Sequence, residues 1–234
     1  MQTSPLRQKD NRVLHLVPSK NGNMPDTASY AEDIADHDKS LNIRHSTRTL
    51  TILFTDLVGS AALKSESGIH KAQTIELEHK RLLLESLRRI QNIYQDNLAQ
   101  AVRLEGDSYI FVFSKSYEAV HFALLALKLH REARAGQWAE LPQFRVGIHS
   151  GEVIVEDGLK GPSRPGGIGD IKGIQADMTA RIMGIACGGQ ILCSSSAFDN
   201  AKQSLTGIDI EGISDKLIWK RHDFYEHIPK IHLQ

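Results

Sequence analysis

The hydrophobic positions of the chain fall into blocks whose spacing predicts strands and helices. The run RTLTILFTDL, which begins at Arg48, is mostly apolar on both alternating sides, a pattern typical of a buried strand. Residues 68–94 instead repeat apolar side chains every three or four positions, which predicts a long helix with one buried and one charged face. A second helix is predicted over residues 117–135.

Glycines between the apolar blocks predict where strands reverse. Glu105-Gly106-Asp107 divides the β-forming segment 101–113, so we expect a hairpin with Asp107 at its tip. In the same way, Ser150-Gly151 predicts a strand pair over residues 144–155.

In the remainder of the chain, predicted helices and strands also alternate. Residues 156–169 are rich in glycine and proline and predict an exposed loop. A helix over 173–186, a strand over 190–193 and a short helix capped by a serine of 194–196 follow. Such alternation indicates an α+β or α/β fold.

Composition and charge narrow the function classes. The chain has 234 residues, with 28 Lys and Arg against 28 Asp and Glu, so no basic field favours nucleic acid as a partner. No apolar run is long enough to span a membrane and no signal peptide is recognisable, which predicts a cytoplasmic protein. Cys187 and Cys193 are too few for a disulfide framework, and we expect both to be reduced and buried.

The first part of the chain differs in texture from the rest. Residues 1–47 are polar with only scattered apolar side chains, so they cannot bury much surface. We therefore predict a mobile polar leader over 1–47 and one domain over 48–234.

Two aspartates follow apolar strands and are candidates for chemistry. Asp56 ends the first predicted strand, and Asp107 lies on the hairpin turn. A lone aspartate in such a place more often caps the following helix, which is the simpler interpretation of Asp56. Two of them brought together by neighbouring strands would repel each other unless a divalent cation such as Mg²⁺ lay between them. Spacing alone does not decide whether the strands are neighbours.

The sequence lacks the motifs of several other classes of enzyme. The sequence contains no GxxxxGK[ST] loop, no GxGxxG fingerprint and no GxSxG elbow, which argues against common ATPase, dehydrogenase and hydrolase sites. His149 lies at a predicted strand end, where a structural role is the expectation.

Four segments in order resemble the motifs of class III nucleotidyl cyclase catalytic domains. They are TILFTDLVGS, VRLEGDSYIFVF, FRVGIHSGEV and GDIKGIQADMTARIMGIACGGQILCS, and the likeness covers about residues 48–205. The resemblance implies an α+β, ferredoxin-like core with a central, mainly antiparallel sheet flanked by helices. It also implies formation of a 3′,5′-cyclic nucleotide and pyrophosphate from a nucleoside triphosphate.

The resemblance assigns the two aspartates to metal binding. Asp56 and Asp107 would bind two Mg²⁺ or Mn²⁺ ions, with the backbone carbonyl of Leu57 completing one shell. One ion would assist attack of the ribose 3′-hydroxyl on the α-phosphate, and the other would hold the triphosphate. The N–H groups of Val58, Gly59, Ser60 and Ala61 would cradle the phosphates.

Two residues of ADMTAR match the transition-state positions of the family. Arg181 stands where an arginine donates to the oxygens of the pentacovalent phosphorus. Asp177 stands where the commonest family residue is Asn. An ionised carboxylate ~4 Å from a phosphate charge would cost about 4 kcal/mol at an effective dielectric of 20, so Asp177 would act protonated or turned toward the ribose.

The base-selecting positions of the family correspond to Arg103 and Asp170. Arg103 can donate to a ring nitrogen and Asp170 can accept from an exocyclic amine, which favours adenine and hence ATP. The Glu and Cys usual in guanylate cyclases are absent. The same pair would nevertheless suit guanine, and the amine of cytosine would satisfy Asp170.

Some features depart from the family. Ala61 replaces a hydroxyl residue, and the usual phosphate-binding lysine near the end of the domain is not recognisable, because Lys230 is a poor substitute in register. Either the sheet closes differently or the native chain continues past Gln234. Family members share active sites across a head-to-tail dimer, which implies a homodimer whose metal residues meet Arg181 and Asp177 of the other subunit.

The sequence therefore predicts an adenylate cyclase. Alternatives are a catalytically weak or inactive cyclase-like module that binds nucleotide and regulates, and a cyclase that uses another base. A structural domain without a site is the least favoured interpretation, since it leaves the ordered motifs unexplained.

Overall fold

The computed structural model describes residues 45–95, 98–157, 167–205 and 219–220. The predicted leader lies outside these residues except for its last three, which belong to the first strand. Most of the predicted loop 156–169 and the C-terminal segment with Lys230 also lie outside them.

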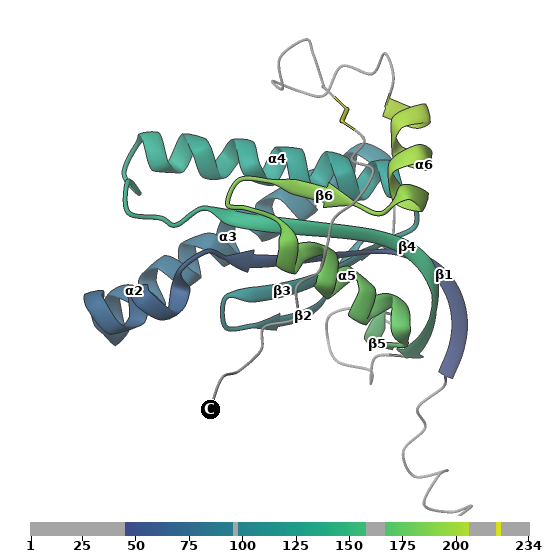
Figure 1. Ribbon diagram of the computed structural model, residues 1–234, viewed down its shortest axis with the longest axis horizontal. Helices are drawn as coiled ribbons and strands as arrows, with labels where there is room; N and C mark the ends of the chain where they lie inside the picture. The colour runs from purple at the N-terminus through teal and green to yellow at the C-terminus, as the bar shows by residue number, and fades with distance from the viewer. Residues whose placement is uncertain (1–44, 96–97, 158–166, 206–218, 221–234) are drawn as a thin grey trace, which may run out of the picture. The chain divides into compact units, whose positions relative to one another are not determined.

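The centre of the described structure is a six-stranded sheet with the order β2-β3-β1-β4-β5, in which β6 also pairs with β4 (Figure 1). Every pairing is antiparallel except the parallel one between β4 and β6. The strands are β1 (His45–Leu57), β2 (Gln100–Glu105), β3 (Ser108–Phe113), β4 (Phe144–Asp157), β5 (Ile168–Lys172) and β6 (Ile191–Cys193). The predicted α+β fold with a mainly antiparallel sheet is confirmed.

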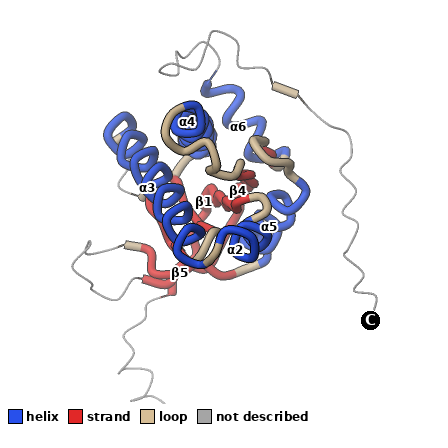
Figure 2. The backbone as a smooth tube through the Cα atoms, turned by 90° about the vertical axis from the view of Figure 1, so that its left-hand side faces the viewer, coloured by secondary structure: helices blue, strands red, loops and turns tan. Residues whose placement is uncertain are grey.

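Helices cover both faces of this sheet. They are α2 (Ser60–Ser67), α3 (Ile69–Tyr94), α4 (Ser116–Ala135), α5 (Ile174–Ile185) and α6 (Ser195–Leu205). Figure 2 shows β1 and β4 with α3 and α4 on one side and α5 on the other. The predicted helices over 68–94, 117–135 and 173–186 are confirmed to within one residue at each end.

Two hydrophobic clusters explain why β1 is apolar on both sides. Leu53 and Leu57 point into the larger cluster, which contains the buried faces of α3, α4 and α6. Leu50 and Ile52 point into a second cluster, against which Ala176 of α5 packs. The strand is buried as its pattern predicts, and its even-numbered positions share a face with α5.

The strand pair predicted over 144–155 is wrong, because these residues form the single strand β4. Gly151 lies opposite Leu50 in an uninterrupted ladder with β1. A Cβ atom at Gly151 would collide with the side chain of Gln175, and one at Gly147 would collide with the backbone of Met183. These glycines therefore serve the close approach of α5 to the sheet and not a turn.

Two smaller expectations also change. Strand β5 was not predicted, because only Ile168 and Ile171 of its five residues are buried and it follows a glycine-rich segment. Cys187 is exposed, contrary to expectation, whereas burial raises the pKa of the Cys193 thiol to about 12. Both cysteines are free thiols, as predicted. No helix in the described ranges has the length and hydropathy to cross a membrane.

Candidate active site

Asp56 lies near the end of β1 between two cross-strand neighbours. It is opposite Ser108 of β3 on one side and opposite Arg145 of β4 on the other. Directly opposed residues project from the same face of a sheet, so all three side chains meet. Ser108 Oγ donates a hydrogen bond to Asp56 Oδ1 at 3.0 Å. Asp56 Oδ2 accepts from Arg145 Nε at 3.0 Å and from Nη2 at 2.6 Å.

Asp56 does not cap the helix that follows it. The N-cap of α2 is Gly59, with φ of 80°, and no side chain caps this helix. Val58 and Gly59 form a turn that Val58 N–H fixes by donating to the Gln143 carbonyl at 2.8 Å. Ser60 and Ala61 are the first residues of α2, where backbone N–H groups have no partner inside the helix. The segment expected to cradle phosphate is thus a turn that leads into a helix N-terminus.

Asp107 lies beside Asp56 through the strand register. The hairpin of β2 and β3 turns at Gly106 and Asp107, and Ser108, the next residue, pairs with Asp56. Tyr109 Oη donates to the Gly106 carbonyl at 2.9 Å, which fixes the tip of the hairpin. The expectation that Asp107 sits at a hairpin tip is confirmed, and the pairing of β1 with β3 shows that this hairpin neighbours the strand of Asp56, which the sequence spacing left open.

Two carboxylates and the Leu57 carbonyl are hard oxygen donors, which fit Mg²⁺ or Mn²⁺. Across the described residues, no three His, Cys, Asp or Glu side chains converge on one point. A two-carboxylate set is typical of Mg²⁺ sites in which the phosphates of a substrate supply further ligands. The donor set therefore fits a cation that binds together with a nucleotide.

A second ion pair lies near the hairpin tip. Lys64 of α2 contacts Glu76 of α3 at 2.8 Å. This hydrogen bond is the main reason that the pKa of Lys64 lies above its ordinary value, and the charge of Asp107 contributes. Burial, together with the charges of Glu76 and Asp107, raises the pKa of Tyr109 to about 12, so its hydroxyl stays a donor.

Arg145 is a residue of this site that the sequence pattern does not reveal. It is a single arginine in the otherwise apolar run FRVGI of β4. Its Nη1 also donates to the Gly184 carbonyl of α5 at 3.2 Å. A lone cation in a buried strand was the available signal, but its partner became evident only from the register of β1 and β4.

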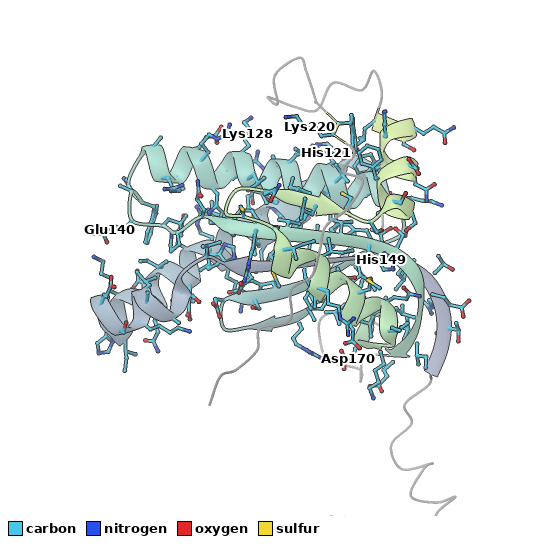
Figure 3. All side chains as sticks on the ribbon, in the orientation of Figure 1. His121, Lys128, Glu140, His149, Asp170 and Lys220 are labelled. Carbon is cyan, nitrogen blue, oxygen red and sulfur yellow. The ribbon has the colours of Figure 1, made fainter. Side chains whose placement is uncertain are left out.

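The two predicted base-selecting residues lie together. Arg103 Nη2 donates to both carboxylate oxygens of Asp170, at 3.0 and 3.3 Å. Arg103 belongs to β2 and Asp170 to β5, which stand at opposite ends of the strand order, so the sheet curls until these strands meet. Figure 3 labels Asp170 at this edge.

The other two predicted residues, Asp177 and Arg181, lie on α5 and are exposed. Within the described residues, no hydrogen bond or ion pair joins either of them to Asp56 or Asp107. Helix α5 is held at its start by His149 Nε2, 2.6 Å from Gln175 Oε1 (Figure 3). His149 therefore has the structural role expected of it, and it fixes the helix that carries both residues.

Comparison with known families is consistent with this geometry. The family model described as "Adenylate and Guanylate cyclase catalytic domain" matches residues 43–215, well over half of the chain. No sequence among the curated proteins matches the chain.

Solved cyclase structures share the fold. The adenylyl cyclase CyaB from P. aeruginosa is 18% identical with a TM-score of 0.55, and the match covers 78% of this chain and 100% of that one. The guanylyl cyclase Cya2 is 20% identical with a TM-score of 0.52, over 67% and 79%. A non-canonical dimeric guanylyl cyclase domain of the RhoGC fusion protein from the aquatic fungus Blastocladiella emersonii is 18% identical with a TM-score of 0.52, over 68% of this chain and 86% of that one.

Proposed function

Since the chain belongs to the family of adenylate and guanylate cyclase catalytic domains, we propose that it converts ATP to 3′,5′-cyclic AMP and pyrophosphate. The observation that carries this proposal is the register that sets Asp56 opposite Ser108, directly beside Asp107. That register brings the hairpin turn that carries Asp107 next to the strand end that carries Asp56, which supports the proposal that both aspartates bind divalent cations. The product would serve intracellular signalling, and the cytoplasmic location stays a prediction from the sequence.

Asp56, Asp107 and the Leu57 carbonyl would hold two Mg²⁺ or Mn²⁺ ions. Bound there, the ions would favour the ribose 3′-alkoxide and neutralise charge on the triphosphate. The protein's own contribution to this half of the site is position, because Ser108 holds the Asp56 carboxylate and the Tyr109 bond to Gly106 holds the hairpin tip on which Asp107 lies.

The phosphates would lie against the start of α2. The amide groups of Gly59, Ser60 and Ala61 would donate to anionic oxygens at this turn and helix N-terminus, whereas that of Val58, contrary to expectation, already donates to the Gln143 carbonyl. Ala61 supplies only its backbone N–H. The left-handed conformation of Gly59 is one that residues with a Cβ adopt at a cost, so this turn depends on glycine.

The adenine base would bind between Arg103 and Asp170. Their ion pair lies at a partly exposed edge, where Arg103 retains unused N–H donors and Asp170 retains acceptor capacity. An exocyclic amine donating to Asp170 and a ring nitrogen accepting from Arg103 match adenine. Guanine and cytosine can also use parts of this pattern, and the solved relatives include adenylyl and guanylyl cyclases.

Arg181 would stabilise the charge on the pentacovalent phosphorus, and Asp177 would bind toward the ribose hydroxyl. Both are exposed on α5, and within the described part of the chain neither forms a hydrogen bond or ion pair with Asp56 or Asp107. This supports a homodimer in which α5 of one subunit completes the metal half of the other.

The test is an assay of the purified chain with ATP, GTP, CTP and UTP, each with Mg²⁺ or Mn²⁺, in which cyclic product and pyrophosphate are both measured. Cyclic AMP formation that Asp56→Ala and Asp107→Ala both abolish supports the proposal. Another cyclic nucleotide would change only the base assignment.

A nucleotide-binding regulatory module is the second candidate. Asp177 in place of Asn, Ala61 in place of a hydroxyl residue and the engagement of Asp56 by Arg145 favour it. Nucleotide binding without cyclic product or pyrophosphate, in a folded dimer, would support this candidate over the cyclase.

A further inference from the structure

The hydrogen bonds of Arg145 place a fixed positive charge against a carboxylate that belongs to the proposed metal site. Two nitrogens of its guanidinium hold Asp56 Oδ2, at 2.6 and 3.0 Å. Resting on the proposed function, we infer that Arg145 is a positioning residue that keeps divalent cations off Asp56 until a nucleotide arrives. The substrate would then be the metal–nucleotide complex, and the free cation would bind poorly.

The partners of the guanidinium make this competition direct. A carboxylate whose Oδ2 already accepts two charge-assisted hydrogen bonds, and whose Oδ1 accepts one from Ser108, has little capacity left for a cation. Binding a metal requires loss of at least part of the Arg145 interaction. The pair is largely shielded, with the Asp56 side chain 17% exposed and the Arg145 side chain 29%, so water screens it incompletely.

The positive charge does not leave the site when Asp56 turns toward a cation. Arg145 Nη1 is also bonded to the Gly184 carbonyl, and the arginine belongs to the central strand β4. At a separation of about 6 Å, repulsion by the guanidinium lowers the binding constant of a divalent cation by roughly a factor of ten, even at the dielectric constant of water. Bare Mg²⁺ or Mn²⁺ therefore meets both an occupied ligand and a like charge.

A nucleoside triphosphate reverses this balance. Its phosphates bring negative charge to the region between the carboxylates and the start of α2, where they can accept the N–H groups that Arg145 withdraws from Asp56. Cation and nucleotide then promote each other's binding, and this coupling is reciprocal by thermodynamic necessity. The Asp56 carboxylate of the resting chain stays compensated without a bound metal.

The experiment measures Mn²⁺ binding to the full chain by electron paramagnetic resonance, without nucleotide. We expect Arg145→Gln to bind Mn²⁺ at least about tenfold more tightly than the wild type, because the competing charge is removed. Arg145→Met is a second charge-free variant that keeps the length of the side chain. Arg145→Lys retains the charge and should stay near the wild type.

The matched control is Arg48→Gln, which removes the same charge from β1 about 26 Å along the strand from Asp56. It should leave Mn²⁺ affinity unchanged. Adding Asp56→Asn to Arg145→Gln should abolish the gained binding, which locates the cation. Equal affinity of wild type and both charge-free variants, or a gain that survives Asp56→Asn, overturns the inference.

The nucleotide arm uses 3′-deoxy-ATP, which lacks the attacking hydroxyl. It should tighten Mn²⁺ binding more in the wild type than in Arg145→Gln, and equal tightening overturns the inference. Failure of the proposed function looks different. If Arg145→Gln gains Mn²⁺ at Asp56 while the wild type makes no cyclic product, the inference stands and the cyclase proposal fails.

Discussion

Two arginine–aspartate pairs lie in the sheet, and they differ in how the fold brings them together. Asp56 and Arg145 are direct neighbours on the paired strands β1 and β4 and are mostly buried. Arg103 and Asp170 come from the two ends of the strand order and are more exposed, at 47% and 29% of their side chains. The first pair is therefore a fixed part of the ladder, whereas the second depends on the curl of the sheet. Exposed pairs of the second kind contribute about 0–1 kcal/mol to stability, so it is the easier one for a ligand to open.

The largest predicted effect is the difference between Asp56 and Asp170 when each is changed to asparagine. Asp56→Asn should lower the rate of pyrophosphate release about a thousandfold or more, because metal assistance contributes several kcal/mol to the transition state. Asp170→Asn should lower it only about tenfold, since it weakens base binding. Steady-state assays of both variants check this, with circular dichroism to confirm folding. Equal losses would mean that the two pairs do not have separate roles.

Mixing two inactive chains tests whether one subunit contains a whole active site. If the site is shared, Asp56→Ala and Arg181→Ala chains that are each inactive should together regain about one quarter of wild-type activity. Half of freely exchanged dimers are mixed, and each mixed dimer has one intact site. The measurement is pyrophosphate release after co-refolding in equal amounts. Persistent inactivity in demonstrably mixed dimers would contradict the shared site.

Base preference should respond to the exposed pair alone. Arg103→Gln and Asp170→Asn should each reduce the ratio of kcat/KM for ATP to that for GTP by about 5- to 100-fold, because each removes one hydrogen-bonding partner of the base. Arg48→Gln serves as a control for lost charge. An unchanged ratio in both variants would remove this pair from base selection.

The smallest predicted effect concerns a pair of buried side chains without charge. His79 Nδ1 lies 2.7 Å from His130 Nε2 in the core. Burial lowers the pKa of His79 well below its ordinary value, and the neighbouring His130 adds to this. Burial, with the charge of Arg134, lowers the pKa of His130 to about 3. Below about pH 6.5 the unfolded chain takes up protons at these residues while the folded chain does not, so the free energy of unfolding falls as the pH falls.

At pH 5.5 this amounts to about 1 kcal/mol for each histidine relative to pH 7.5. Urea unfolding at both pH values measures it. A variant with both His79→Phe and His130→Leu should lose most of the difference, whereas His70→Gln, on an exposed position of α3, should retain it. The same pH dependence in the double variant would show that other groups cause it.

Much of the fold could be predicted because it is local in sequence. The helix spacing of 68–94 and the glycine of the 101–113 hairpin each determine an element from a few adjacent residues, and both predictions are confirmed. The turn expected at Ser150-Gly151 was wrong because a glycine can equally permit the close approach of a helix. Only the position of α5 distinguishes the two uses.

The contacts of the candidate site also differ in how far they could be predicted, according to their separation in the sequence. The nearness of Asp107 to the strand of Asp56 required only a hairpin beside β1. The partnership of Asp56 with Arg145 joins residues 89 positions apart, and that of Arg103 with Asp170 joins residues 67 apart. No periodicity encodes either, because strand register and sheet curvature arise from packing of the whole domain.

The meeting of β2 and β5 also bears on how the protein avoids self-association. Terminal strands of a sheet expose unpaired backbone groups on which strands of other molecules can polymerise. Here the strands at the two ends of the described order meet, and the opposite charges of Arg103 on β2 and Asp170 on β5 join them. An incoming strand would have to separate these charges before it could pair. The contact proposed to choose a base would therefore also guard the protein against aggregation.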